Sequence, residues 1–241
     1  MSPTPGVAPA VCFDATGTLI ETARPIGETY RRVALDHGID LPAWRIEDAF
    51  RRILAHAPPR GTEGETPAER RRAETRWWFE RIRQTFQATD STVRFEDFEG
   101  FATALFETYR SPRAWRLRAG AREMLCRLEG LECPMAIVSN FDHRLPDILQ
   151  GLGILDFFRT VLIPSSTGFR KPDHRLFEVA AGALERPLAS IVYVGDDEAS
   201  VLENIAGHGL RVIDVREGGG LEGLPDRIAR LAIVPEPSER S

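Results

Sequence analysis

Cysteine is scarce in this chain of 241 residues, which contains three: Cys12, Cys126 and Cys133. An odd number at irregular spacing favours neither a disulfide framework nor a zinc site. Unpaired thiols of this kind are typical of proteins in reducing compartments. We therefore expect reduced cysteines and a cytoplasmic protein.

Basic charge and long apolar runs are also lacking. The formal net charge is -5, so the chain has none of the basic excess with which proteins bind nucleic acid or acidic membranes. Met1–Gly6 contains neither the basic nor the apolar segment of a signal peptide. No apolar run approaches the roughly 20 residues of a membrane span. We expect no nucleic-acid or membrane partner, and leave both a monomer and a homodimer open.

The chain does contain a series of short apolar segments, each of the kind that forms a buried parallel strand. Helical patterns alternate with them at residues 120–128, 145–152, 176–184 and 199–206. Strands that alternate with helices predict an open α/β fold with a parallel sheet. The predicted strands are residues 7–13, 135–138, 160–163, 191–194 and 210–213.

Between about residues 21 and 113 the pattern changes to helices without strands. Apolar residues recur at helical spacing in 25–37 and 95–109. Thr66, Pro67 and Glu69 predict a helix start, with Thr66 as N-cap and Glu69 completing a capping box. We therefore predict a catalytic core from 7–20 and 114–232, a helical insert at 21–113, and a disordered polar tail at 233–241.

Polar residues follow three of the predicted strands at the point where each strand ends. They are Asp14, Ser139 and Asp196. In an open parallel sheet, ligands bind beyond the carboxyl ends of the strands. We therefore expect these three residues to lie in one functional site.

The residue types near these strand ends suit a phosphate group and a metal ion. A carboxylate such as Asp14 is costly at the end of a buried strand unless a cation lies beside it, and Gly17 lets the chain turn tightly after it. Lys171, extended by the proline that follows, can neutralise a phosphate. Adjacent acids such as Asp196 and Asp197 suit Mg²⁺, which takes one or two carboxylates and keeps several waters.

The four segments around Asp14, Ser139, Lys171 and Asp196 each also have a plain structural explanation when taken alone. A strand-end Asp or Ser can simply form a turn, a lysine can be solvated, and acids are favoured at a helix N-terminus. The four segments in this order, each after its own strand, indicate a functional site far more strongly than any one of them.

Their order resembles the haloacid dehalogenase superfamily. Its four motifs are an Asp-x-Asp-Gly-Thr loop, a strand ending in Ser or Thr, a Lys often followed by Pro, and a Gly-Asp acidic cluster. The resemblance covers about residues 9–232 and implies a three-layer α/β/α, Rossmann-like parallel sheet with an all-helical cap inserted after the first strand. Closer similarity to the branch around rhythmically expressed gene 2 and haloacid dehalogenase-like hydrolase domain-containing protein 3 lies in Pro25–Tyr30, Trp77–Trp78, Ser139–Asp142 and Gly168–Pro172.

The resemblance implies a magnesium-dependent phosphatase that acts on small phosphate esters through an aspartyl-phosphate on Asp14. A phosphorylated small molecule would be its partner and Mg²⁺ its cofactor. The implied catalytic residues are Asp14, Thr16 and Lys171; the implied phosphate ligands are Thr18, Ser139, Asn140 and Lys171; the implied metal ligands are Asp14, Thr16 through its backbone carbonyl, Asp196 and Asp197.

Two positions depart from the family pattern. Thr16 replaces the second Asp of the first motif, the general acid/base, whose help is worth roughly 10²–10⁴-fold in rate. Val201 stands where the fourth motif often has a further Asp. These differences leave open whether the chain has full, slow or no activity.

Two other functions stay open beside a phosphatase. A catalytically weak member could serve as a binding or regulatory protein, which Thr16 and Val201 favour. A 2-haloacid dehalogenase uses the same Asp without a metal, but has no need for the Asp196–Asp197 cluster. Outside the motifs, we expect Trp77–Phe79 to pack within the cap, Arg70–Arg72 to form a solvated face, and His143 to lie in a turn.

Overall fold

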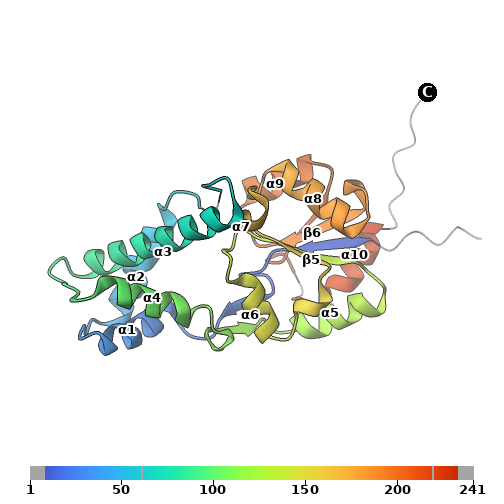
Figure 1. Cartoon of the computed structure of the whole chain (residues 1–241). Helices are drawn as coiled ribbons and strands as arrows, with labels where there is room; N and C mark the ends of the chain where they lie inside the picture. The colour runs from blue at the N-terminus through green and yellow to red at the C-terminus, as the bar shows by residue number, and fades with distance from the viewer. Residues whose placement is uncertain (1–8, 61, 219, 233–241) are drawn as a thin grey trace, which may run out of the picture.

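A parallel sheet lies at the centre of one half of the molecule (Figure 1). The computed structural model describes residues 9–60, 62–218 and 220–232. Each neighbouring pair of strands is parallel, and the five predicted strands are confirmed with shifts of a few residues at their ends. The strand order is β5 (Thr160–Leu162), β4 (Met135–Val138), β1 (Ala10–Phe13), β6 (Ile191–Gly195) and β7 (Arg211–Asp214).

Helices cover both faces of this sheet, because successive residues of a strand point to opposite faces. Val11 and Phe13 of β1 pack on one side against α5 (Ala121–Gly130), α6 (Leu145–Gly151) and α10 (Leu224–Ala232). Ala10 and Cys12 pack on the other side against α8 (His174–Leu184) and α9 (Ala199–Gly207). In Figure 1, α8 and α9 lie above the strands and α5 and α6 below them. The predicted three-layer α/β/α fold is confirmed.

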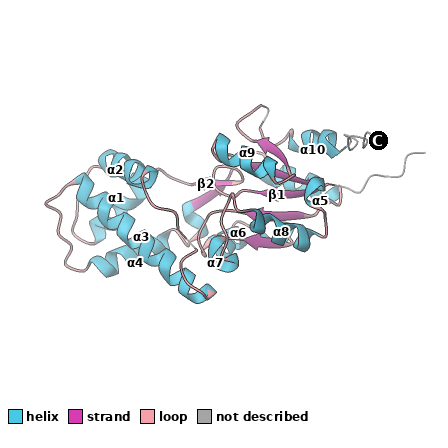
Figure 2. Ribbon diagram, turned by 90° about the horizontal axis from the view of Figure 1, so that it is seen from above, coloured by secondary structure: helices cyan, strands magenta, loops and turns pink. Residues whose placement is uncertain are grey.

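Four helices between β1 and β4 form a separate cap, seen at one end of the molecule in Figure 2. They are α1 (Ile26–Asp36), α2 (Ala43–Ala55), α3 (Pro67–Thr89) and α4 (Phe98–Thr108). Their own apolar core includes Tyr30, Phe86 and Phe101, all buried. The predicted start of α3 is confirmed: Thr66 Oγ1 accepts a hydrogen bond from the Glu69 amide, and the Glu69 carboxylate accepts one from the Thr66 amide.

Two short strands connect the cap to the core, where the sequence predicted none. β2 (Ile20–Thr22) and β3 (Trp115–Leu117) pair antiparallel, with Glu21 opposite Arg116. We call this pair the β2–β3 ribbon. Three residues are too few for an alternating pattern to be recognised, which is why the sequence missed both strands. The predicted boundaries after residues 20 and 113 fall beside this ribbon and stay a prediction.

Short helical turns complete the described chain. They are η1 (Pro112–Ala114), η2 (Leu155–Phe157), α7 (Pro164–Thr167) and η3 (Leu188–Ser190). None of the helices within the described ranges is both long and apolar enough to cross a membrane. The tail predicted to be disordered, residues 233–241, lies outside the described residues.

Candidate active site

The three strand-end residues come together because their strands are neighbours. Asp14 follows β1, which lies between β4 and β6. Ser139 follows β4, and Asp196 follows the last residue of β6. The site therefore lies at the carboxyl edge of the sheet, where the strand-end rule places ligands.

Lys171 lies directly against Asp14. Its Nζ donates a hydrogen bond of 2.8 Å to Asp14 Oδ1, and the Lys171 side chain is only 1% exposed. Burial alone would lower the pKa of the lysine, but Asp14 and Asp197 outweigh burial and raise it. Lys171 therefore stays positively charged beside the predicted nucleophile.

The side chain of Asn140 fixes the backbone of Lys171. Its Oδ1 accepts a hydrogen bond of 2.8 Å from the Lys171 amide, and its Nδ2 donates one of 3.2 Å to the Lys171 carbonyl. The sequence singled out Asn140 as a phosphate ligand. In the structure its side-chain amide joins the second motif to the third, and so positions the lysine.

Tyr193, which sequence reasoning missed, belongs to the same cluster. Lys171 Nζ donates a 2.6 Å hydrogen bond to the Tyr193 hydroxyl and one of 2.9 Å to Asp197 Oδ2. The Tyr193 hydroxyl in turn donates to Asp197. A Cβ at Gly195 would lie 2.9 Å from the Tyr193 hydroxyl and 2.8 Å from Asp197 Oδ2, so a glycine is needed there. Because a buried tyrosine needs a hydrogen-bond partner, this residue could have been suspected from its place on a buried strand.

Asp196 lies against the turn that follows Asp14. The Thr18 hydroxyl donates a hydrogen bond of 3.0 Å to Asp196 Oδ1, and Thr18 is fully buried. Gly17 has a φ of +83°, and a Cβ there would lie 2.0 Å from Asp196 Oδ2. The turn thus requires glycine both for its backbone angle and for the approach of the carboxylate. Thr18, predicted to bind phosphate, is occupied in holding Asp196.

The donor set at this edge fits a magnesium ion. Within residues 9–60, 62–218 and 220–232, no three His, Cys, Asp or Glu side chains are grouped as a metal cluster. Asp14, Asp196 and the Thr16 carbonyl remain, and Mg²⁺ characteristically takes one or two carboxylates and keeps several waters. Asp197, also predicted as a ligand, is engaged by Lys171 and Tyr193 instead.

A cavity of about 480 Å³ opens over this edge between the core and the cap. Asp14, Thr16 and Lys171 line its core side, and Thr16 is exposed. Trp77 and Trp78 of α3 line its cap side, and Trp78 also packs against the apolar core of the cap, as expected. The cavity volume is in the range typical of small-molecule sites.

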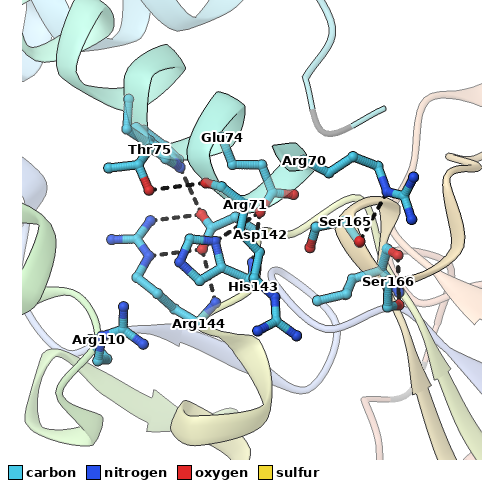
Figure 3. Close-up of polar contacts among 12 residues, drawn as sticks. Arg70, Arg71, Glu74, Thr75, Arg110, Asp142, His143, Arg144, Ser165 and Ser166 are labelled. Carbon is cyan, nitrogen blue, oxygen red and sulfur yellow. Dashed lines mark hydrogen bonds and ion pairs between the residues drawn. The ribbon is translucent and has the colours of Figure 1, made fainter. Parts of the chain in front are cut away.

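The loop after β4 binds the cap through buried polar groups. Arg144 donates to both carboxylate oxygens of Asp142, at 2.8 and 2.7 Å, and also to the Phe106 carbonyl of α4. Glu74 of α3 accepts a hydrogen bond from the His143 amide, and the same carboxylate lies 2.9 Å from Nδ1 of the His143 ring. Figure 3 shows His143 beside Glu74, whereas Arg70 points away from them toward Ser165. His143 is therefore a cap contact as well as a loop residue.

Arg70 corrects a further expectation from the sequence. Its Nε donates a 3.0 Å hydrogen bond to the Ser165 carbonyl of α7 (Figure 3). The residue is 8% exposed, whereas Arg71 and Arg72 are exposed as predicted. The expected solvated face is thus wrong at its first position, which is a second polar link between cap and core.

Comparison with known sequences identifies relatives of the predicted branch. The chain is 34% identical over 189 residues to haloacid dehalogenase-like hydrolase domain-containing protein 3 of Mus musculus, covering 76% of this chain and 72% of the relative. It is 23% identical over 178 residues to the rhythmically expressed gene 2 protein of Drosophila melanogaster, covering 70% and 67%. A phosphoglycolate phosphatase of Cereibacter sphaeroides is 28% identical over 219 residues, covering 87% and 86%.

Solved structures share the fold at lower identity. The YfnB protein of Bacillus subtilis, solved with bound magnesium, superposes with a TM-score of 0.68 at 15% identity, covering 94% of this chain and 99% of that one. A HAD phosphatase of Thermococcus onnurineus gives a TM-score of 0.58 at 19% identity, covering 91% and 97%.

The family model of haloacid dehalogenase-like hydrolases matches residues 8–203. That stretch includes all the groups that meet at the carboxyl edge of the sheet, from Asp14 to Asp197. Sequence, fold and site thus agree that this chain is a hydrolase of the haloacid dehalogenase-like family.

Proposed function

We propose that the chain is a magnesium-dependent phosphatase that hydrolyses phosphate monoesters through an aspartyl-phosphate on Asp14. The observation that carries this proposal is the 2.8 Å contact between Lys171 Nζ and Asp14 Oδ1, inside the cavity at the end of the central strand. A carboxylate and a buried cation held together in this way suit attack on an anionic phosphate, because the cation offsets the repulsion between them.

In the first step, a carboxylate oxygen of Asp14 would attack phosphorus, and the bond from phosphorus to the ester oxygen would break. The leaving oxygen takes the electron pair of that bond. In the second step, a water would attack the phosphorus of the aspartyl-phosphate, and the bond between phosphorus and the Asp14 oxygen would break, which releases phosphate and regenerates the carboxylate. The water would lose its proton to solvent, and the leaving oxygen of the first step would take one up from solvent. Lys171 would bind the phosphoryl oxygens in both steps, while Asn140, Tyr193 and Asp197 hold the lysine in place.

The metal would be bound by Asp14, the Thr16 carbonyl and Asp196. Bound Mg²⁺ would supply charge stabilisation to the phosphoryl group. Thr18 orients Asp196 for this role by its hydrogen bond to Oδ1. Thr16 cannot act as a general acid, so esters with good leaving groups are expected to be the better substrates.

The test is steady-state hydrolysis of aryl and alkyl phosphates by the purified chain, with and without magnesium after chelation. Asp14→Asn should abolish turnover because an amide is barely nucleophilic. Asp156→Asn is the matched control, because Asp156 is exposed on η2, and it should retain wild-type rates.

Turnover retained by Asp14→Asn would refute the assignment of the nucleophile. Hydrolysis unaffected by exhaustive chelation would refute the magnesium requirement. If no ester is hydrolysed by the folded wild type, a binding or regulatory role is the better description.

A further inference from the structure

The cap side of the cavity is unusually aromatic. Rings from all four cap helices and from β3 reach it, and together they form a largely apolar wall. These rings belong to Tyr30, Phe50, Trp77, Trp78, Phe106 and Trp115. A phosphoryl group alone would leave this wall in contact with water, which is unfavourable for apolar surface.

Two arginines that line the same cavity, Arg60 and Arg170, form no ion pair with a carboxylate among the described residues. Nε of Arg60 and Nε of Arg170 are out of contact with water, and neither donates a hydrogen bond in the part of the chain that the structure describes. Arg144, which also lines the cavity, differs because Asp142 accepts from two of its nitrogens. Buried polar atoms normally have a hydrogen-bond partner, and a ligand could supply the one that each of these two Nε atoms lacks.

Arg60 is held over the tryptophans. Its guanidinium carbon lies 4.9 Å from the ring centre of Trp77 and 4.7 Å from that of Trp78. Burial lowers the pKa of Arg60, with Asp142 and Glu74 attracting the charge from further away and Arg144 and Arg170 repelling it. Burial also lowers the pKa of Arg170. An anion bound near both guanidinium groups would relieve this unfavourable burial of charge.

Arg170 precedes Lys171 in the chain and so lies next to the proposed phosphoryl site, whereas Arg60 lies in the cap. We propose that the substrate is a phosphate monoester whose organic group contains an aromatic ring and carries a second anionic group, with the ring against the tryptophans and the second anion bound by Arg60 and Arg170. This inference rests on the proposed function, because it assigns the phosphoryl group to Asp14 and Lys171.

The test uses three phosphonates, which cannot be hydrolysed, and measures their binding to the chain in magnesium buffer by titration calorimetry. Methylphosphonate has neither extra group, benzylphosphonate adds the ring, and 4-carboxybenzylphosphonate adds the ring and the second anion. Affinity should rise at each step, and the carboxylate should add about tenfold or more, as expected for a charge-assisted hydrogen bond.

Arg60→Gln and Arg170→Gln should each remove most of the gain due to the carboxylate, a larger loss than either causes in benzylphosphonate binding. Arg60→Lys, which keeps the charge, should retain part of the gain. Arg72→Gln is the matched control, since Arg72 lies on the exposed face of α3, and it should bind all three ligands as the wild type does. If a variant fails to fold, the series on the wild type still decides the matter.

Equal affinity for the three ligands, weaker binding of the carboxylate, or failure of all three to bind would overturn the inference. An equal loss in Arg72→Gln would overturn the assignment to Arg60 and Arg170. The two proposals fail separately. Phosphonates bound in the expected order without hydrolysis of any ester would refute the phosphatase and support the ligand class. Hydrolysis of esters together with equal binding of the three phosphonates would support the phosphatase and refute the ligand class.

Discussion

The indole nitrogen of Trp78 donates a 2.7 Å hydrogen bond to Oδ2 of Asp142. The same oxygen accepts a hydrogen bond from Arg144, so a cap helix and a core loop share one buried carboxylate. Asp142 lies three residues beyond Ser139 of the active site. The position of the cap over the cavity is therefore coupled to the loop that follows β4.

Asp142→Ala should lower the free energy of unfolding by about 3–5 kcal/mol, because it leaves Arg144 buried without its partner. Asp142 is fully buried and Arg144 is 3% exposed. Urea unfolding followed by circular dichroism gives the value. The matched control is Asp147→Ala, which breaks an exposed pair with Arg110 and should change stability by no more than about 1 kcal/mol. An equal decrease in the free energy of unfolding in both variants would show that burial of the Asp142–Arg144 pair does not determine its contribution to stability.

The contribution of Asp142 to stability should be lost in acid. Burial alone would raise the pKa of Asp142, but Arg144 outweighs burial and holds it well below the usual range. A lowered pKa in the folded state stabilises the protein above the unfolded value, about 3.9 for aspartate, and this stabilisation falls as pH drops below that value. The stability difference between wild type and Asp142→Asn should thus be constant above about pH 5 and shrink below about pH 4. Urea unfolding at a series of pH values measures it, and a difference that grows in acid would contradict the ion pair.

Gly17→Ala should abolish magnesium-dependent turnover, because the added Cβ would lie 2.0 Å from Asp196 Oδ2. Gly38→Ala is a close control. Its φ is +76°, near the +83° of Gly17, but nothing lies within 4 Å of a Cβ there. Both variants should lose about 1–2 kcal/mol of stability from the left-handed backbone, and only Gly17→Ala should lose activity. Wild-type turnover in Gly17→Ala would show that Asp196 can move without consequence for the site.

Thr16→Asp should raise turnover of alkyl phosphates more than that of aryl phosphates. Alkoxide leaving groups need a proton, and a carboxylic acid supplies it where threonine cannot; the gain should reach up to the roughly 10²–10⁴-fold range of general acid–base catalysis. Thr16 is exposed and lines the cavity, so there is room for the larger side chain. Matched aryl and alkyl esters assayed on both forms, with acid quenching to trap an aspartyl-phosphate, provide the measurement. Equal wild-type rates on both esters without a trapped intermediate would mean that another group donates the proton.

The sheet and the meeting of Asp14, Ser139 and Asp196 could be predicted because their signals are local. A strand buried on both faces reads as a continuous apolar run, and its last residue marks the ligand-binding edge. Lys171 could not be predicted from a local signal, because a lone lysine is usually solvated. Only its position in the sequence between the second and fourth motifs indicated that it belongs to the site.

The remaining parts of the site depend on contacts between residues far apart in sequence. Arg70 meets Ser165 across 95 residues, and Trp78 meets Asp142 across 64. Nothing within α3 distinguishes these side chains from their exposed or packed neighbours. The β2–β3 ribbon was missed because its strands are too short to show an alternating pattern, and because the residues that pair, such as Ile20 and Leu117, stand on either side of the cap in the sequence.

The central place of β1 in the sheet has a consequence for synthesis on the ribosome. β1 is made before both of its neighbours in the sheet, β4 and β6, and Phe13 meets Ile137 and Val194 there. The apolar core of the cap is built entirely from residues between 26 and 109, so it can assemble while β1 has no partner. At roughly 5–20 residues per second, the apolar segment Ala10–Phe13 waits on the order of ten to thirty seconds for β6. Until β6 is made, β1 lacks at least one of its two neighbouring strands while the cap can already be folded, and such an exposed apolar strand is the kind of intermediate that chaperones bind.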